Sequence, residues 1–580
     1  MRRFLPKVLS AALAFSSLQA MAAADLVLLN GKVFTAEPGQ PLAQAVAVEN
    51  GKILKVGSNA EIKALAESGA KTIDLGGRVL MPGLIDSHSH AIMGGLELAS
   101  ANMASEQVSL EELEQRLRKW RDDGSAKHGD ILSVGGMHSS YWSQIEGFAE
   151  RFNKGEWAEQ PLVFIGWDHH TGWANDALLK HAGIDAARVR ALPEAERDTI
   201  GHRADLSPNG FLADAGLDPV LAKLPAATDA ELLHAAQAAV RYNNELGITA
   251  WMDPAANAAP GAALFDLKPT EKTVGVLPVY KALADKGELN AHVAALLVAH
   301  PKSTPADLAT LDKVRQQFQG IPNLSLPGIK IFADGVPEYP AQTAAMIDPY
   351  SNSQKRGELL IDPAHFGELV SAADQRGWLV HIHALGDRAV RESLNGIEQA
   401  RKDRQSGIAH SITHLQMVNP KEFARFKPLD VIASMQLYWA SADDVTIDLV
   451  KPYINALAFH YQYPAHSLHA KGATIAGASD WPVTTPNPWY AIYQAVTRKG
   501  PKGVLNEAER IDRETMFYAY TRNAARTLGL EQQIGSLAPG KQADLILLDR
   551  DVFEVPAQAL KDTQVLKTFF AGREVYSRAE

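Results

Sequence analysis

Residues 79–90 read VLMPGLIDSHSH, an apolar run that a proline–glycine pair interrupts and that ends in a polar cluster. Side chains two positions apart on a β-strand point to the same face, so His88 and His90 share one face if the strand continues through them. Two imidazoles on an inward face can bind one metal ion. A His-x-His pair alone is weak evidence, but its place directly after an apolar strand strengthens it.

The rest of the chain repeats this design. Short apolar runs that end in polar residues alternate with helix-like stretches such as residues 363–376 and 389–400. Strand–helix alternation predicts a parallel α/β sheet, and eight repeats predict a closed (β/α)8 barrel of the TIM type. The eight candidate strands are residues 83–85, 248–252, 291–298, 328–332, 379–382, 411–413, 431–435 and 474–478.

Both ends of the chain are rich in β-strand signals. Asn30-Gly31 and Asn50-Gly51 lie between apolar runs, which is typical of hairpins, and a similar pattern returns within residues 534–572. We predict a small β-sandwich from residues 25–82 and 531–580, with the barrel in residues 83–530. About 160 residues separate the first two candidate strands, so residues 105–240 are predicted to form an inserted subdomain over the barrel mouth.

The first 24 residues have the three parts of a secretory signal peptide. Arg2, Arg3 and Lys7 precede an apolar stretch over residues 8–18, and Ala-x-Ala cleavage sites follow. The alternative is a membrane anchor, but the apolar stretch is too short to cross about 30 Å of hydrocarbon as a helix. We predict a mature protein that starts near residues 23–25, lies in the bacterial periplasm or outside the cell, and is not bound to a membrane.

Composition narrows the chemistry and the partners. The 580-residue chain has no cysteine and a formal net charge of −10. Disulfides, a thiolate nucleophile and cysteine-bound zinc are therefore excluded, and a metal must be held by histidines, carboxylates or a modified side chain. No basic run offers a surface for nucleic acid. The expected partner is a small-molecule substrate, and assembly into a homo-oligomer is left open.

The candidate strand over residues 328–332 contains a lysine among apolar residues. Burial lowers the pKa of Lys330 because the charged amine loses its hydration. A neutral amine can take up CO2, and the resulting carboxylate can bridge two cations. A salt-bridged core lysine and a Schiff-base lysine are the two alternatives.

Other polar residues follow further candidate strands. His381 and His383 share a face by the strand pleat, so only one of them need bind a metal. His414 ends the sixth candidate strand. Asp480 follows the eighth, where a carboxylate close to a metal-bound water could act as a general base.

The sequence resembles the amidohydrolase superfamily, specifically the YtcJ-like branch of the amidohydrolase 3 group. The resemblance covers nearly the whole mature chain and rests on VLMPGLIDSHSH, GIKIFADG, HIHALGDRAV, SITHLQ, GASDWPV and IGSLAPGKQADLILLD. It implies a metal-dependent hydrolase that cleaves a C–N bond of an amide, N-acyl, N-formyl or cyclic amide compound with metal-activated hydroxide. The alternative is a non-catalytic periplasmic ligand-binding or regulatory protein on the same fold.

The resemblance also assigns roles to residues of this sequence. It implies two divalent ions, with zinc the expected metal, and a proton-shuttling carboxylate at Asp480. A histidine of the inserted segment, His170 within DHHTGWAN (168–175), matches a family residue that faces the active site, and a surface-loop histidine is the alternative. The implied metal ligands are His88 and His90 for the more buried ion, N6-carboxylated Lys330 as the bridge, His383 and His414 for the second ion, and Asp480.

The sequence departs from many relatives directly after the fourth candidate strand. Residues 336–339 read VPEY, so Glu338 either contacts substrate or forms a solvated salt bridge. Several tryptophans lie in segments expected at the barrel mouth, and an aromatic-lined pocket would favour an apolar or aromatic substrate group. Core packing is the alternative for each of them. They are Trp142, Trp167, Trp173, Trp439, Trp481 and Trp489.

Overall fold

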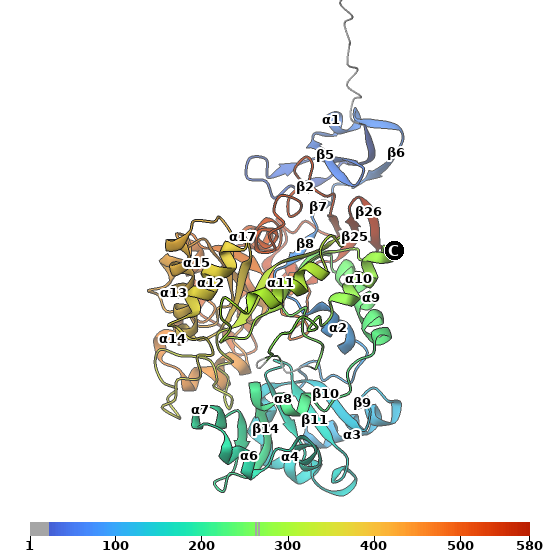
Figure 1. The fold of residues 1–580 in the computed structure, drawn as a ribbon. Coiled ribbons are helices and arrows are strands. Elements are labelled where there is room, and N and C mark those ends of the chain that lie inside the picture. Colours follow the sequence, from blue (N-terminus) through green and yellow to red (C-terminus); the bar gives the residue numbers. More distant parts are fainter. Residues whose placement is uncertain (1–22, 262–263, 265–266, 580) are drawn as a thin grey trace, which may run out of the picture.

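The computed structural model of the chain describes residues 23–261, 264 and 267–579 (Figure 1). The predicted signal peptide, residues 1–24, therefore lies outside the described residues except for its last two positions. No helix in the described part of the chain is both long and apolar enough to cross a membrane.

Eight parallel strands form the central sheet, and each strand predicted from the sequence has its counterpart there. The strand order is β21-β20-β19-β18-β17-β16-β15-β8, so neighbours in sequence are neighbours in space, as in a TIM-like barrel. The strands are β8 (Leu84–Asp86), β15 (Ile248–Asp253), β16 (His292–Val298), β17 (Leu324–Phe332), β18 (Leu379–Ala384), β19 (His410–His414), β20 (Val431–Met435) and β21 (Thr474–Gly477).

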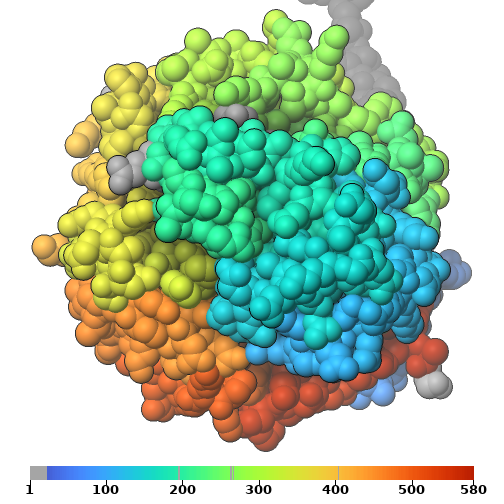
Figure 2. Space-filling model, turned by 90° about the horizontal axis from the view of Figure 1, so that it is seen from below, coloured from blue at the N-terminus to red at the C-terminus, as the bar shows by residue number. Residues whose placement is uncertain are grey.

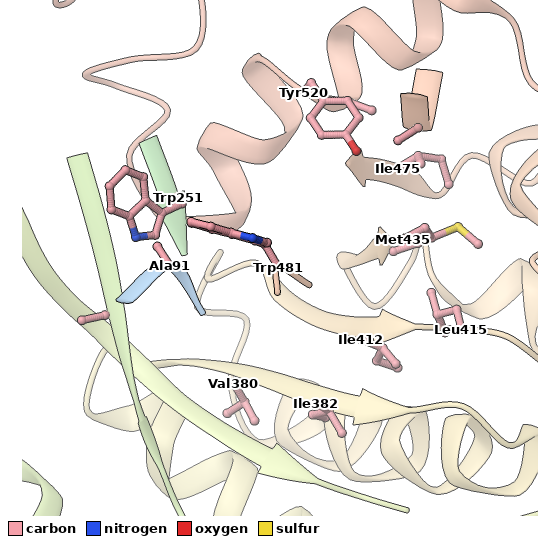
Figure 3. Packing of buried hydrophobic residues seen from close by; sticks show 14 of the residues in the cluster. Ala91, Trp251, Val380, Ile382, Ile412, Leu415, Met435, Ile475, Trp481 and Tyr520 are labelled. Carbon is pink, nitrogen blue, oxygen red and sulfur yellow. The ribbon is translucent and has the colours of Figure 1, made fainter. Parts of the chain in front are cut away.

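The first and last strands meet at their carboxyl ends and nearly close the barrel. The Ser87 backbone N–H donates to the Gly477 carbonyl at 3.0 Å, and the Asp480 N–H donates to the His88 carbonyl at 2.8 Å. Gly477 is required here because a Cβ at this position would lie 2.4 Å from the ring of Tyr520. Figure 3 shows Tyr520 close to Ile475 of β21.

Helices surround the barrel strands (Figure 1). Val380 and Ile382 on β18 belong to the apolar layer between strands and helices (Figure 3). The alternate residues, His381 and His383, therefore point to the barrel interior. The helices that contribute to this layer include α2 (Ala91–Glu97), α9 (Asp229–Glu245), α10 (Leu277–Asp285), α11 (Leu308–Gln317), α12 (Phe366–Gln375), α13 (Asp387–Asp403), α15 (Ala465–Ala470), α16 (Pro488–Thr497) and α17 (Arg513–Ala519).

Two sheets lie at the end of the molecule that holds both chain ends. A six-stranded sheet in the order β26-β25-β24-β7-β2-β3 combines residues from both ends of the chain, and a four-stranded sheet has the order β5-β4-β1-β6. Leu28, Val46 and Leu545 belong to one apolar cluster between them. The strands are β1 (Ala24–Leu29), β2 (Lys32–Phe34), β3 (Leu42–Ala43), β4 (Ala45–Glu49), β5 (Lys52–Gly57), β6 (Ala66–Asp74), β7 (Val79–Pro82), β24 (Leu545–Leu548), β25 (Val565–Phe570) and β26 (Arg573–Ser577).

A third sheet, in the order β13-β14-β12-β11-β10-β9, lies between the first and second barrel strands in sequence. It sits at the end of the molecule opposite the terminal sheets (Figure 1), and in Figure 2, seen from that side, the cyan and green atoms of this part of the chain cover much of the face. Helix α9 begins within predicted residues 105–240 but packs in the barrel's apolar layer, and the domain boundaries stay predictions. The strands are β9 (Lys127–His128), β10 (Ile131–Met137), β11 (Leu162–Gly166), β12 (Thr171–Ala174), β13 (Ile200–His202) and β14 (Pro208–Ala213).

Candidate functional site

The residues predicted to form the site lie together at the carboxyl ends of the barrel strands. They line one cavity of about 270 Å³. A second cavity of about 560 Å³ shares part of this lining, and residues of the inserted segment cover it. The predicted residues in the first cavity are His88, His90, His170, Lys330, His383, His414 and Asp480.

Three of these residues converge on a point where a metal ion could bind. One donor atom each from His88, His414 and Asp480 lie within 4.8 Å of one another. Asp480 Oδ1 is 3.2 Å from His88 Nε2 and 3.3 Å from His90 Nε2, and Asp480 Oδ2 is 3.8 Å from His414 Nδ1. Imidazole and carboxylate donors suit divalent ions such as zinc, so this donor set fits the metal that the resemblance implies.

Two of the converging residues have an unusual backbone. His414 has a φ of 77° and Asp480 a φ of 59°, in the left-handed region that residues other than glycine rarely adopt. Such a conformation persists only where the surrounding structure enforces it, and it is concentrated at functional sites. The backbone therefore supports these two positions as parts of a site.

The charges at this point favour metal binding. Burial, and secondarily the charge of Lys330, lowers the pKa of His88 to about 3, so its imidazole is neutral, as a ligand must be. Burial also holds the pKa of His383 and His414 well below the ordinary value. For Asp480, burial would raise the pKa, but contacts with His88, His90 and His414 outweigh it and lower the pKa.

Lys330 lies inside the barrel on β17. It is 1% exposed, and its Nζ is 4.9 Å from the centre of the Phe332 ring. Burial lowers the pKa of Lys330 to about 7, against the opposing charge of Asp480. Among the described residues Lys330 has no salt-bridged partner, so the salt-bridged alternative is not supported. A large fraction of neutral amine at neutral pH is the condition that CO2 uptake requires.

Comparisons with known proteins agree with this arrangement. A family model described as "Amidohydrolase family" matches residues 71–576. The chain belongs to the amidohydrolase family. The resemblance inferred from the sequence is thereby confirmed, and membership supports a hydrolase.

Three proteins illustrate the similarity of this amidohydrolase to others. "Protein LONG AFTER FAR-RED 3" of Arabidopsis thaliana is 29% identical over 568 residues, covering 95% of this chain and 92% of that protein. "N-substituted formamide deformylase" of Arthrobacter pascens is 25% identical, covering 96% and 98%. The crystal structure of an uncharacterized metal-dependent hydrolase from Pyrococcus horikoshii has a TM-score of 0.68 at 24% identity, covering 92% and 99%.

The strand pleat alone left open which histidine of β18 binds a metal, and the family resemblance named His383. In the structure His383 lines the cavity, and His381 has other partners. His381 Nε2 is 2.7 Å from His88 Nδ1, and His381 Nδ1 is 2.6 Å from Ser411 Oγ. Both ring nitrogens of His381 are therefore engaged. If Ser411 accepts from His381 and His381 accepts from His88, then His88 Nε2 keeps its lone pair for a metal. Partners of this kind orient metal-binding histidines.

The other candidate ligands have partners of the same type. His414 Nδ1 is 3.1 Å from Gln436 Oε1, and His383 Nε2 is 3.3 Å from the Gly335 carbonyl. Each contact engages one ring nitrogen and leaves the other for a ligand role. For His414 the engaged Nδ1 is also the atom 3.8 Å from Asp480 Oδ2, so Nε2 is the nitrogen that stays open. The roles of His381 and Gln436 were missed in the sequence. The inward-facing polar positions of β18 were the available signal for His381, whereas nothing singled out Gln436.

We expect His381→Ala to weaken metal binding by about 10–100-fold, the usual effect of losing a partner that orients a ligand. His381→Gln should restore part of the loss, because its amide can still hydrogen-bond His88. Metal affinity is measured by competition with a chelator. The matched control is His292→Ala, which removes a buried histidine bonded to Asp544 at 3.0 Å outside the site. Unchanged affinity in His381→Ala would show that His381 only fills space.

Two buried carboxylates hold the strand ends in register. Asp86 accepts hydrogen bonds from the His88 N–H at 3.1 Å, the Ser479 N–H at 3.0 Å and the Ser479 hydroxyl at 2.5 Å. It thus ties the end of β8 to the segment that carries Asp480. Asp334 accepts from three backbone N–H groups, those of Ala345, Leu385 and Gly386. Burial raises the pKa of Asp86 to about 7 and that of Asp334 to about 8, although the hydrogen bonds oppose this.

His170 enters the site from the inserted sheet, between β11 and β12. Its Nδ1 is 2.7 Å from Asp214 Oδ1, and its ring stacks on His383 with centroids 5.3 Å apart. Burial opposes protonation of His170, but the hydrogen bond and charge of Asp214 outweigh it and raise the pKa. His170 therefore lies inside the site rather than on a surface loop, and its catalytic role stays a prediction.

The tryptophans predicted at the mouth divide into two groups. Trp167, Trp439 and Trp481 line the larger cavity, and the Trp439 ring stacks on His414 with centroids 5.6 Å apart and planes at 9°. For the other three the prediction is wrong, because they are buried in apolar clusters and do not line either cavity. They are Trp142, Trp173 and Trp489.

Proposed function

We propose that the protein hydrolyses a C–N bond in a small amide, N-acyl, N-formyl or cyclic amide compound. The observation that carries this proposal is the convergence of His88, His414 and Asp480 donor atoms within 4.8 Å in the cavity at the barrel mouth. The relative named as a formamide deformylase supports a C–N bond as the target. The alternative is a non-catalytic ligand-binding protein on the same fold.

The residues present fit two divalent ions, with zinc the expected metal. His88 and His90 would hold one ion, His383 and His414 the other, Asp480 would add a carboxylate, and N6-carboxylated Lys330 would bridge the two. Bound divalent ions at such a site polarise a substrate carbonyl and lower the pKa of water. The absence of cysteine from the chain is consistent with a site built from histidines and carboxylates.

The protein's own residues would move the proton that hydrolysis requires. Asp480 lies in the wall of both cavities, and its lowered pKa keeps the carboxylate ionised. An ionised carboxylate there can take a proton from water and return it to the leaving nitrogen. His170, held by Asp214 at 2.7 Å, would donate a hydrogen bond to the substrate carbonyl oxygen and stabilise the negative charge that develops there. The inserted segment would exclude bulk water.

The test combines metal analysis with a substrate panel. Purified protein is analysed for bound metal and assayed on N-formyl amines, N-acyl amines, N-acyl amino acids and cyclic amides. We expect about two divalent ions per chain from the ligand set, and metal-dependent hydrolysis of at least one class. A metal-loaded protein that binds members of the panel and hydrolyses none would favour the ligand-binding alternative. Full activity in a metal-free preparation would contradict the site.

We also propose that the chain is exported and cleaved near residues 23–25, from the basic start, apolar stretch and Ala-x-Ala sites of residues 1–24. N-terminal sequencing of the protein from its native host should start within those residues. A double Arg2→Glu, Arg3→Glu variant should accumulate in the uncleaved form. Native protein that retains Met1 would contradict export by this route.

A further inference from the structure

The larger cavity has acidic side chains but, among the residues that the structure describes, no basic ones apart from histidines. Its other charged lining residues are all acidic, and the described residues that line it include no lysine and no arginine. A substrate with a carboxylate tail would meet negative charge there and would find no guanidinium or amine to bind it. The acidic residues are Glu97, Asp168, Glu338, Asp443 and Asp480.

Four of these five carboxylates have side-chain partners within the protein. Their carboxylates therefore already have hydrogen-bonding or charged partners, either in the surrounding structure or among the candidate metal ligands. The contacts are Glu97 with His169 and Asn102, Asp168 with Thr171, Asp443 with Thr446, and Asp480 with His88 and His90.

Glu338 differs from the other four. It is 8% exposed and lines the cavity, yet among the described residues its carboxylate has no salt-bridged partner, and the one hydrogen bond it accepts comes from its own backbone N–H. The solvated salt bridge considered for Glu338 is therefore not supported. Its backbone is fixed, because the Gln342 N–H donates to its carbonyl at 3.0 Å and the next residue, Tyr339, donates to the Leu449 carbonyl at 2.9 Å.

The electrostatic surroundings leave this carboxylate uncompensated. The pKa of Glu338 is raised to about 8, and burial is the largest cause. The charges of Asp168 and Asp443 also raise it, whereas the bond from its own backbone N–H and the charge of His170 lower it. His170 is itself paired with Asp214 at 2.7 Å. A buried anion without a counter-ion is costly, so Glu338 is mostly protonated at neutral pH until a cation arrives. A positive charge that enters the cavity beside Glu338 would favour the ionised carboxylate and would be bound by it.

Aromatic rings line the cavity that Glu338 shares with His414 and Asp480. Trp439 stacks on His414, and Trp167 meets Trp439 edge to face with centroids 6.2 Å apart. Tyr463 is buried in the same wall and interacts electrostatically with Glu338. Aromatic faces bind both apolar groups and cations, so this wall suits an apolar spacer that ends in a cationic nitrogen.

We propose that Glu338 binds a cationic amine of the substrate, so that the protein prefers amides whose second end carries an ammonium group on an aromatic or apolar spacer. This inference rests on the proposed hydrolytic function and names its substrate class. Glu338 would act by binding and orienting substrate. It would discriminate against amides with a carboxylate tail, including N-acyl amino acids, which the metal point alone would accept.

Three amides with one skeleton test the proposal. They are N-acetyl-p-xylylenediamine, N-acetyl-4-methylbenzylamine and 4-(acetamidomethyl)benzoate, whose para substituents are an ammoniomethyl, a methyl and a carboxylate group. For the wild-type protein we expect kcat/KM to fall in that order, with roughly 10- to 100-fold between the first two, as for a hydrogen bond to a charged group. In Glu338→Gln the ratio of the first two should fall to about one, mainly through KM.

Calorimetry gives a second readout that needs no turnover. The diamine product, p-xylylenediamine, should bind the wild-type protein at least about tenfold more tightly than it binds Glu338→Gln, while 4-methylbenzyl alcohol, which has no amine, should not distinguish the two. The control is Glu368→Gln, which removes the same charge from an exposed residue of α12 with 55% side-chain exposure and should preserve both ratios.

The outcomes separate the two proposals. If the wild-type protein hydrolyses the methyl and ammonium amides equally well, the amine subsite is wrong while the hydrolytic function stands. If it hydrolyses no amide of this series or of the wider panel, the hydrolytic function fails, and the calorimetric comparison still decides whether Glu338 binds amines. Equal binding of the diamine by the wild type and Glu338→Gln would overturn the subsite.

Discussion

The Asp480→Asn variant is expected to lose about 10²–10⁴-fold in kcat, the usual effect of removing general acid–base catalysis. Asparagine keeps the shape and one acceptor oxygen of Asp480 but cannot take up and return a proton. KM should change far less, because the lost interaction belongs to the transition state. kcat, KM and metal content are measured on the same preparation, since Asp480 also contacts His88 and His90 at 3.2 and 3.3 Å.

The control for this variant is Asp285→Asn. Asp285 is exposed on α10 and pairs with Lys281 at 2.5 Å, away from the cavities, so the change should leave both constants as they are. If Asp480→Asn loses its metal, the comparison is made at saturating metal. A near-normal kcat in a metal-loaded Asp480→Asn protein would remove Asp480 from the proton transfer.

Lys330→Ala is expected to bind less metal than the wild-type protein, because the change would remove the bridging ligand itself. Its loss of activity should exceed the roughly 10–100-fold that is typical when a residue that only orients a ligand is removed. The space left on the buried face of β17 should admit a short carboxylic acid. Acetate or propionate is therefore expected to restore part of the metal content and part of the activity. Metal is counted by elemental analysis, with and without the added acid.

Lys313→Ala serves as the matched control, because Lys313 is an exposed lysine with 57% side-chain exposure that pairs with Glu271. It should change neither metal content nor response to acetate. Full metal content and activity in Lys330→Ala would contradict the bridging role. An experimental structure with two bound ions and an unmodified Lys330 amine would contradict the carboxylation.

Most of the barrel could be predicted because its signals are local. Each strand is a short apolar run, and the polar residue that ends it marks the same edge of the sheet, where His88, Lys330, His414 and Asp480 come together. The parallel order then follows from sequence order, since strands that follow one another along the barrel lie side by side. These features depend on residues close together in the chain.

The details that escaped prediction depend on contacts between distant residues. His381 and His383 are equivalent in the strand pleat, so only the family resemblance pointed to His383, and the contact of His381 with His88 Nδ1 at 2.7 Å could not be foreseen. The pairing of His170 with Asp214 depends on the register that aligns Thr171 of β12 with Ala213 of β14. Trp173 is a residue type that often lines pockets, but here it is buried in the apolar cluster of the inserted sheet.

The pairing of β7 has a consequence for how the chain folds during synthesis. β7 lies between β2, from the start of the chain, and β24, from its end, with Leu80 opposite Leu547. Such pairing has a very high contact order, and closing so long a loop is slow. Until the last 40 or so residues have been made, one edge of β7 lacks its backbone partners, and an open strand edge invites association with other chains. Pairing of β24 with β7 is thus expected to be a late step in the folding of the chain.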